Sequence, residues 1–265
     1  PYIYVSKYIN VVKNNRAYSL PNQDPANCIT FDRAVEVCYN KGAGWHLMTA
    51  AEWGVLHNLI TAQQLEPRGN TNNGRHHVKT YEHGVLSPQN PNGVYRTLTG
   101  TGGSAWEALG VTDIVGNVHK WIVARLVDGE IQIIPNNNAA IHKTDLGANS
   151  TAWRAILQDG SLVAPGTAGT LKFDYTGNPA NGTTAFHITT TLEHQQKDDA
   201  AGYGGKDFGT LTAKTGVTVP DLLKALALFP NTDRTGRGYI YFRNNGERLL
   251  IRGGNYGPGG HAGGG

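Results

Sequence analysis

The first helix is predicted by four apolar residues that recur at the 3.6-residue period of an α-helix. They are Phe31, Ala34, Val35 and Cys38. The pattern predicts a helix over 31–39, with Thr30 as its N-cap and Gly42 as the residue that stops it. Because the apolar residues share one face, we expect this helix to pack on the rest of the fold.

A second helix is predicted to begin at Thr49. The run Thr49-Ala-Ala-Glu52 has the form of a capping box, in which two side chains satisfy backbone N–H groups at the helix start. An apolar stripe follows, and the helix should end near Leu65. Residues 67–112 are rich in glycine and proline and lack periodicity, so a long ordered loop is expected there.

Two β-hairpins are predicted by runs of strand-forming residues. The first joins Trp121–Val127 to Glu130–Ile134 through Asp128-Gly129, a dipeptide favoured in tight hairpin turns. The second joins Tyr239–Arg243 to Arg248–Arg252. Alternation along the first strand of this second hairpin should send Tyr239 and Tyr241 to one face and Ile240 and Phe242 to the other.

The remaining pattern predicts three further elements. These are a strand over Tyr2–Val5, a short helix over Thr151–Ile156 and a helix over Pro220–Phe229. Residues 135–216 are mixed and include the short helix over Thr151–Ile156; we interpret this stretch as an insertion. We find no repeat and no linker, so one elaborated domain over 1–265 is expected.

Composition agrees with short strands and long loops. Of 265 residues only 16% are charged, whereas 35 are glycine and 12 are proline. The net charge of +3 is spread along the chain, which argues against nucleic acid as a partner. No apolar run approaches the roughly 20 residues that span a bilayer, and the first residues lack a signal-peptide pattern, so we expect no membrane insertion.

Cysteine and histidine offer little metal chemistry. Cys28 and Cys38 cannot supply four zinc ligands; a single bridge between them is compatible with the sequence, but separate thiols, with Cys38 buried, are the expectation. None of the ten histidines has the i, i+4 spacing of a zincin. We expect His119 to be partly buried and hydrogen-bonded rather than catalytic.

Three segments, in order, resemble the formylglycine-generating-enzyme (sulfatase-modifying factor) family. They read AVEVCYNKGAGWHLMTAAEW (34–53), DIVGNVHKW (113–121) and IRGGNY (251–256). The resemblance implies an α+β, C-type-lectin-like fold with a small, twisted, mainly antiparallel sheet, flanking helices and long loops. It also implies structural roles for Trp45, Trp53, Gly116, Asn117, Trp121, Arg252, Gly253 and Gly254. In physical terms Gly116 permits a tight turn and the amide of Asn117 can hold neighbouring loops.

Departures from that family argue against its chemistry. The enzymes bind copper through a late cysteine pair, whereas no cysteine follows Cys38 here. The family's calcium-binding glutamate corresponds to Lys120, and a cation at that position opposes calcium binding. We therefore expect neither metal, no cofactor and no enzymatic activity.

The chain is more similar to non-catalytic members of this fold that retroelements diversify, among them phage tail proteins. That resemblance implies a variable segment from about residue 255 onward. The expected ligand-binding residues are Tyr239, Tyr241, Asn255, Tyr256 and His261, a mix of residue types that antibody paratopes also use. The implied partners are a host cell-surface protein or glycan and other virion subunits, with a homo-oligomer supplying avidity.

The expected location is the phage tail or a cell surface. Two alternatives remain at this point: a structural tail or filament subunit whose loops contact neighbouring copies, and a sulfatase-modifying-type oxidoreductase with an unusual centre. Exposed apolar loop residues packed against a neighbouring copy would favour the structural subunit.

Overall fold

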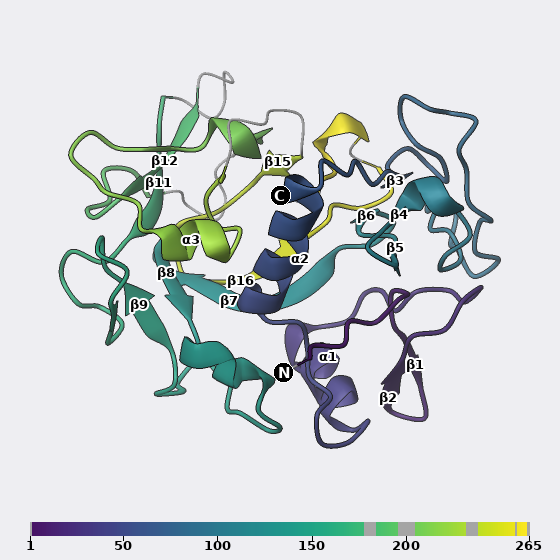
Figure 1. Ribbon diagram of the computed structural model, residues 1–265, viewed down its shortest axis with the longest axis horizontal. Coiled ribbons are helices and arrows are strands. Elements are labelled where there is room, and N and C mark those ends of the chain that lie inside the picture. The colour runs from purple at the N-terminus through teal and green to yellow at the C-terminus, as the bar shows by residue number, and fades with distance from the viewer. Residues whose placement is uncertain (1, 178–183, 196–204, 232–237, 258, 264–265) are drawn as a thin grey trace. The chain divides into compact units, whose positions relative to one another are not determined.

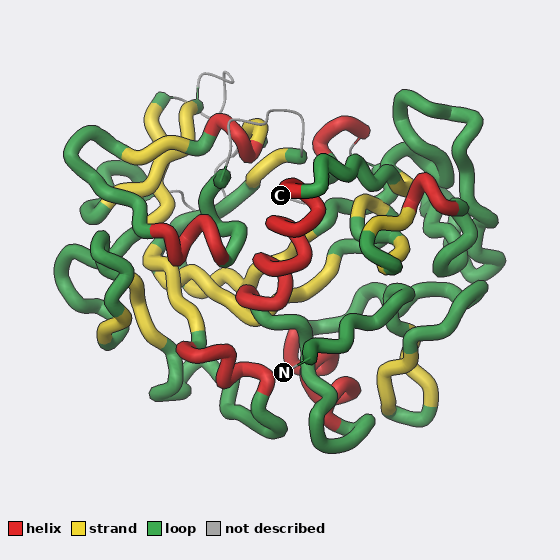
Figure 2. Tube along the Cα trace, viewed as in Figure 1, coloured by secondary structure: helices red, strands yellow, loops and turns green. Residues whose placement is uncertain are grey.

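The computed structural model describes residues 2–177, 184–195, 205–231, 238–257 and 259–263 (Figure 1). The chain divides into two compact units. The first comprises Pro1–Leu47, Leu56–Trp121 and Ile251–Gly265, and the second comprises Met48–Val55 and Ile122–Leu250. The described chain has few helices and mixed sheets, so the α+β class is confirmed, and Figure 2 shows how much of it is loop and turn. The single-domain interpretation stays a prediction.

The first two predicted helices form where the sequence places them. Helix α1 spans Phe31–Tyr39, and Thr30 Oγ1 accepts the Arg33 N–H at 3.2 Å. Helix α2 spans Ala50–Ala62. The capping box is confirmed: Thr49 N–H donates to Glu52 Oε2 at 3.0 Å, and Glu52 N–H donates to Thr49 Oγ1 at 3.1 Å. Short 3₁₀ turns lie at Ser104–Trp106, Pro135–Ala140, Phe208–Thr210 and Gly259–His261.

The main sheet has eight strands. They are β7 (Lys120–Val127), β8 (Glu130–Ile133), β9 (Arg154–Ile156), β10 (Leu162–Val163), β11 (Lys172–Thr176), β12 (Ala185–Thr189), β14 (Thr212–Ala213) and β16 (Glu247–Arg252). The order is β10-β9-β8-β11-β12-β14, with β7 pairing with both β8 and β16. The β12–β14 pair is parallel, and the other strand pairs with a described register in this sheet are antiparallel. The predicted β7–β8 hairpin is confirmed, and Asp128 and Gly129 both have positive φ, as a tight turn requires.

Four two-stranded pairs complete the described strands. They are β1 (Val11–Lys13) with β2 (Arg16–Tyr18), β3 (Gly69–Asn70) with β6 (Val115–Gly116), β4 (Glu107–Ala108) with β5 (Val111–Thr112), and β13 (Lys206–Asp207) with β15 (Tyr239–Ile240). The β3–β6 pair is parallel and the others are antiparallel. None of the helices in these described ranges is long and apolar enough to cross a bilayer.

The second predicted hairpin is wrong. Strand β15 pairs with β13, and β16 pairs with β7. The connection between β15 and β16 is held by a residue distant in sequence, because the fully buried Asn244 side chain donates to the His194 carbonyl at 2.7 Å. Phe242 also packs against Phe173 with ring centroids 5.3 Å apart. These long-range contacts override the local preference for a hairpin.

Three other predictions also change. Residues Tyr2–Val5 form no strand, and Tyr2 and Tyr4 are almost fully exposed. The predicted helix at 151–156 is instead a loop followed by β9, because Ala155 pairs with Gln132 of β8. Helix α3 spans only Asp221–Ala225, and Ala227 adopts a left-handed φ of 51° that ends the helical geometry. The 135–216 stretch contributes β9 to β14, so it builds sheet as well as loop.

The family-motif tryptophans have different environments. Trp53 is buried, with 3% of its surface exposed. Trp121 is half-buried, donates from Nε1 to the Ile29 carbonyl at 3.0 Å and meets Phe31 edge-on. Trp45 lies at the surface, with 43% exposed and the Lys41 ammonium 3.3 Å from its ring centroid, so it is not a core residue.

The cysteines are separate thiols. Cys28 is exposed in a loop, and Cys38 is half-buried on α1. Burial raises the pKa of the Cys38 thiol to about 11, which keeps it protonated and unreactive at neutral pH. The expectation of two unbridged cysteines is confirmed, although Cys38 is less buried than predicted.

Candidate functional site

Asn117 connects three segments of the first unit. Its side chain is fully buried, accepts the Thr97 N–H at 2.9 Å and donates to the Thr97 carbonyl at 3.0 Å. Its backbone N–H donates to the Asn70 carbonyl at 2.8 Å. The prediction that this amide holds neighbouring loops together is confirmed.

Gly116 makes the tight turn predicted for it. Its φ is +73°, and a Cβ atom there would lie 2.1 Å from the Asn70 carbonyl oxygen. The Gly116 N–H also donates to the Gly253 carbonyl at 2.6 Å. This glycine therefore joins the β3–β6 pair to the chain that leaves β16.

The glycine pair after Arg252 sets the direction of the C-terminal segment. Gly253 and Gly254 have φ values of +81° and +68°, which favour glycine. A Cβ on Gly253 would lie 2.5 Å from the Ile114 carbonyl oxygen, and one on Gly254 would lie 2.6 Å from Ala262 Cβ. Arg252 is buried, and this burial lowers the pKa of its guanidinium to about 10. The turn is thus determined by close packing on both sides.

The segment after this turn, Asn255–Gly257 and Gly259–Ala262, is anchored mainly through its backbone. The Tyr256 carbonyl accepts the Asn73 N–H at 2.8 Å, and the Gly259 N–H donates to the Thr71 carbonyl at 2.8 Å. The Asn255 side chain also contributes, because it accepts the Gly257 N–H at 2.9 Å and lies 3.1 Å from His119 Nε2. We call this the display segment.

The five predicted ligand-binding residues fall into two groups. Asn255 and Tyr256 are half-buried and His261 is exposed, all on the display segment of the first unit. Tyr239 and Tyr241 belong to the second unit. The structure therefore brings together three of the predicted residues in one place and two in another.

The two tyrosines of the second unit form their own aromatic pair. Their ring centroids are 6.2 Å apart, and 45% of the Tyr241 surface is exposed. Ile240 and Phe242 are buried at 9% and 8% exposure, so the predicted alternation is confirmed. A Cβ on Gly205 would lie 2.3 Å from the Tyr241 ring, so glycine at this position leaves room for that ring.

Lys120 occupies the position that the family resemblance assigns to a calcium ligand. Its ammonium donates to the Gly116 carbonyl at 2.6 Å, and desolvation lowers its pKa to about 7. The neighbouring Asp113 carboxyl is buried, which raises its pKa. Because an ammonium group already binds this carbonyl, these residues do not fit a calcium ion. Within the described residues, no three His, Cys, Asp or Glu side chains are arranged to hold a metal.

The histidines near the display segment are held by hydrogen bonds. His77 Nδ1 lies 2.8 Å from Thr71 Oγ1, and His76 Nδ1 accepts the Lys79 N–H at 2.9 Å. His119 is exposed rather than partly buried, but its predicted hydrogen bonding is present in the Asn255 contact. These rings add polar surface next to the display segment.

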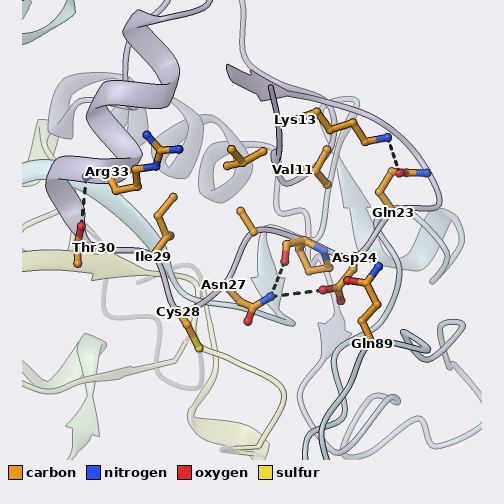
Figure 3. Close-up of a pocket in the computed structure, with 13 residues that line it drawn as sticks. Val11, Lys13, Gln23, Asp24, Asn27, Cys28, Ile29, Thr30, Arg33 and Gln89 are labelled. Carbon is orange, nitrogen blue, oxygen red and sulfur yellow. Dashed lines mark hydrogen bonds between the residues drawn. The ribbon is translucent and has the colours of Figure 1, made fainter. Parts of the chain in front are cut away.

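A cleft of about 530 Å³ in the first unit was missed by the sequence analysis (Figure 3). It lies between β1 and residues 23–30, with Arg33 and Gln89 also lining it. Lys13 Nζ donates to Gln23 Oε1 at 2.9 Å, and Asn27 Nδ2 donates to the Pro25 carbonyl at 2.9 Å. The Asn14-Asn15 pair between two short strand-forming runs was the signal for the β1–β2 hairpin that forms one wall.

These observations define an α+β protein whose first unit carries a glycine-directed display segment on a buried asparagine network. No protein-family model matches the chain, and no curated protein matches it significantly. The C-type-lectin resemblance therefore stays a prediction, and function must be inferred from the site itself.

Proposed function

We propose that this chain is a non-enzymatic binding protein of the C-type-lectin-like type, and that it recognises a host cell surface as part of a phage tail. The observation that carries the proposal is the way the display segment is anchored. Tyr256 and Gly259 are held through backbone atoms, which do not depend on side-chain identity. Side chains in this segment can therefore change while the turn below them stays intact.

The residue types of the display segment and of the Tyr239–Tyr241 pair are suited to recognising a polar surface. Tyrosine supplies rigid amphipathic area at low entropic cost, and histidine and asparagine supply adaptable hydrogen bonds. Tyr256 and His261 provide this mix in the first unit, and Tyr241 adds exposed aromatic surface in the second. A host cell-surface protein or glycan is the ligand class that fits, with avidity in an oligomeric virion structure strengthening weak single contacts.

The proposal is tested by sequencing the 3′ end of the gene across a population of its source. We expect substitutions to concentrate at Tyr256 and His261, with Asn255 varying less because its side chain makes hydrogen bonds. Gly116, Asn117 and the glycine pair should stay constant. An invariant display segment would contradict diversification, and the protein would then be interpreted as an adhesin of fixed sequence.

A second test exchanges naturally occurring display segments between alleles. We expect the exchange to change which bacterial strains the purified protein binds, while its thermal unfolding midpoint stays the same. A matched exchange at the exposed residues 147–149, outside the display segment, should leave strain binding unchanged. Strain binding that ignores the display segment would contradict the proposal.

A structural subunit is the alternative, and one observation favours it. Four large apolar side chains within nine residues of the first unit are exposed: Val78 at 66%, Tyr81 at 74%, Val85 at 57% and Leu86 at 47%. Exposed apolar patches mark interaction surfaces. Electron microscopy of the purified chain at rising concentration tests this alternative, since a filament subunit should assemble into regular polymers and a soluble adhesin should not.

A further inference from the structure

Strand β1 has an open edge that faces the cleft. The turn Asn14-Asn15 has two residues with positive φ, so Lys13 and Arg16 form the hydrogen-bonded pair that closes the hairpin. The next pair, Val12 with Ala17, is then non-hydrogen-bonded, and the Val12 N–H and C=O point away from β2. No hydrogen bond to either group is found among the described residues.

The cleft lies along this same edge. The Asn10 carbonyl, two residues before Val12, accepts the Ala26 N–H at 2.9 Å. This bond places the wall formed by residues 23–30 beside the outer edge of β1. Beyond that bond the two segments separate, and Val12 lines the resulting cleft together with Ile29 and Arg33. The cleft therefore offers one unpaired backbone donor and acceptor next to apolar and cationic side chains.

Residues Tyr2–Val5 are of strand-forming types but bury little surface. Tyr2, Ile3 and Tyr4 are 91%, 57% and 88% exposed. The chain is fixed immediately afterwards, because the Thr112 N–H donates to the Lys7 carbonyl at 2.8 Å. Three consecutive large apolar side chains in water indicate an interaction segment, and their alternating β-branched and aromatic types favour a strand.

We propose that Tyr2–Val5 of one copy of this chain adds as a strand to the open edge of β1 in a second copy, within the cleft. Backbone pairing to Val12 gives the added strand its register. Alternation places Tyr2 and Tyr4 on one face, where their rings can contact the cations of Lys13 and Arg33. A cleft of about 530 Å³ has room for a few residues.

A second copy is the occupant that the structure favours, because the same unit carries both the unpaired segment and the unpaired edge. Each copy in such an exchange contributes one segment and one cleft. The contact is small, so association is expected to be concentration-dependent. This inference does not rest on the proposed ligand-binding function, since it concerns a different surface of the first unit.

Light scattering of the full 265-residue chain after size-exclusion chromatography gives the first test. We expect the mass to rise with concentration from that of the single 28.5 kDa chain to multiples of it. Val12→Pro removes the outward N–H without removing a β1–β2 bond, so it should abolish the rise. Val12→Thr keeps the N–H and serves as the matched control. A constant single-chain mass for the parent protein, or association that survives Val12→Pro, overturns the proposal.

Disulfide trapping identifies the contact and does not depend on how well Val12→Pro folds. Cys28 is exposed and lines the cleft. Under mild oxidation Tyr4→Cys should form an intermolecular disulfide with Cys28, visible as a dimer on a non-reducing gel, and Tyr4→Cys/Cys28→Ser should lose it. A bond formed only within one chain would overturn exchange between copies, as would dimers that persist without Cys28.

Discussion

At the residue scale, buried polar side chains hold the loops of this fold in one conformation. Asn117 satisfies backbone groups of Thr97 on a loop that has no regular secondary structure. The side-chain amide of Asn117 therefore satisfies the backbone N–H and C=O groups that a neighbouring strand would satisfy in a sheet. The sequence indicated the role through the GNV motif, but its partner Thr97 lies 20 residues away and was not predictable.

Asn117→Ala should destabilise the protein by about 2 to 4 kcal/mol, because it leaves a buried N–H and a buried C=O unpaired. Chemical denaturation monitored by tryptophan fluorescence measures this change. Asn149→Ala, at an exposed loop position, is the control and should change stability by less than about 0.5 kcal/mol. Equal effects of the two substitutions would contradict the assigned role.

Gly253→Ala and Gly246→Ala separate backbone strain from steric clash. Both glycines have positive φ, but a Cβ meets nothing within 4 Å at Gly246 and meets the Ile114 carbonyl oxygen at 2.5 Å at Gly253. We expect a loss of about 1 kcal/mol at Gly246 from strain alone. At Gly253 a further 1 to 3 kcal/mol, roughly, should come from overpacking. Thermal unfolding of both variants measures the difference, and a smaller loss at Gly253 would disprove the close packing.

At the scale of elements, the sequence patterns for N-caps and tight turns correctly predicted the starts of two helices and one hairpin turn. Thr30 and Thr49 cap α1 and α2 through contacts that span only three residues. Asp128-Gly129 closes β7–β8 in the same local way. Strand partners were less predictable: β15 and β16 are both strands, yet they pair with β13 and β7 instead of with each other.

Thr49→Ala tests the α2 cap. The substitution removes the acceptor for the Glu52 N–H and also the hydroxyl that donates to Asn137 Oδ1, so we expect a loss of about 1 to 2 kcal/mol in unfolding free energy from the two bonds together. Thr49→Ser keeps the hydroxyl and should restore most of that loss. If serine were as destabilising as alanine, the methyl group of Thr49, which is buried, would be responsible instead of the hydroxyl and its two hydrogen bonds.

At the scale of the whole molecule, Lys120 makes global stability depend on pH. Its pKa falls from an ordinary 10.5 to about 7 in the folded protein. Between these values the unfolded chain binds more protons, so stability should rise as pH increases from about 7 toward 10.5. The buried Cys38 thiol acts in the opposite direction between its ordinary pKa of 9.0 and its folded value of about 11.

The contribution of Lys120 is isolated by subtracting the pH–stability curve of Lys120→Met from that of the parent. The Cys38 contribution cancels in this difference. We expect the rise between pH 7 and 10.5 to be absent from the variant. A variant that keeps the full rise would show that Lys120 is not the desolvated group.

The sequence by itself determined what depends on neighbours a few residues apart: two helix caps, one hairpin turn and the alternation of Tyr239 to Phe242. It also determined the roles of Gly116 and Asn117, since a positive φ and a free amide are properties of the residue types. The tertiary structure decided strand partners, the exposure of Tyr2–Val5, the cleft beside β1, and the division of the five predicted binding residues between two units. Each of these depends on segments that are distant in sequence competing for the same backbone groups and the same buried space, and no local pattern records the outcome of that competition.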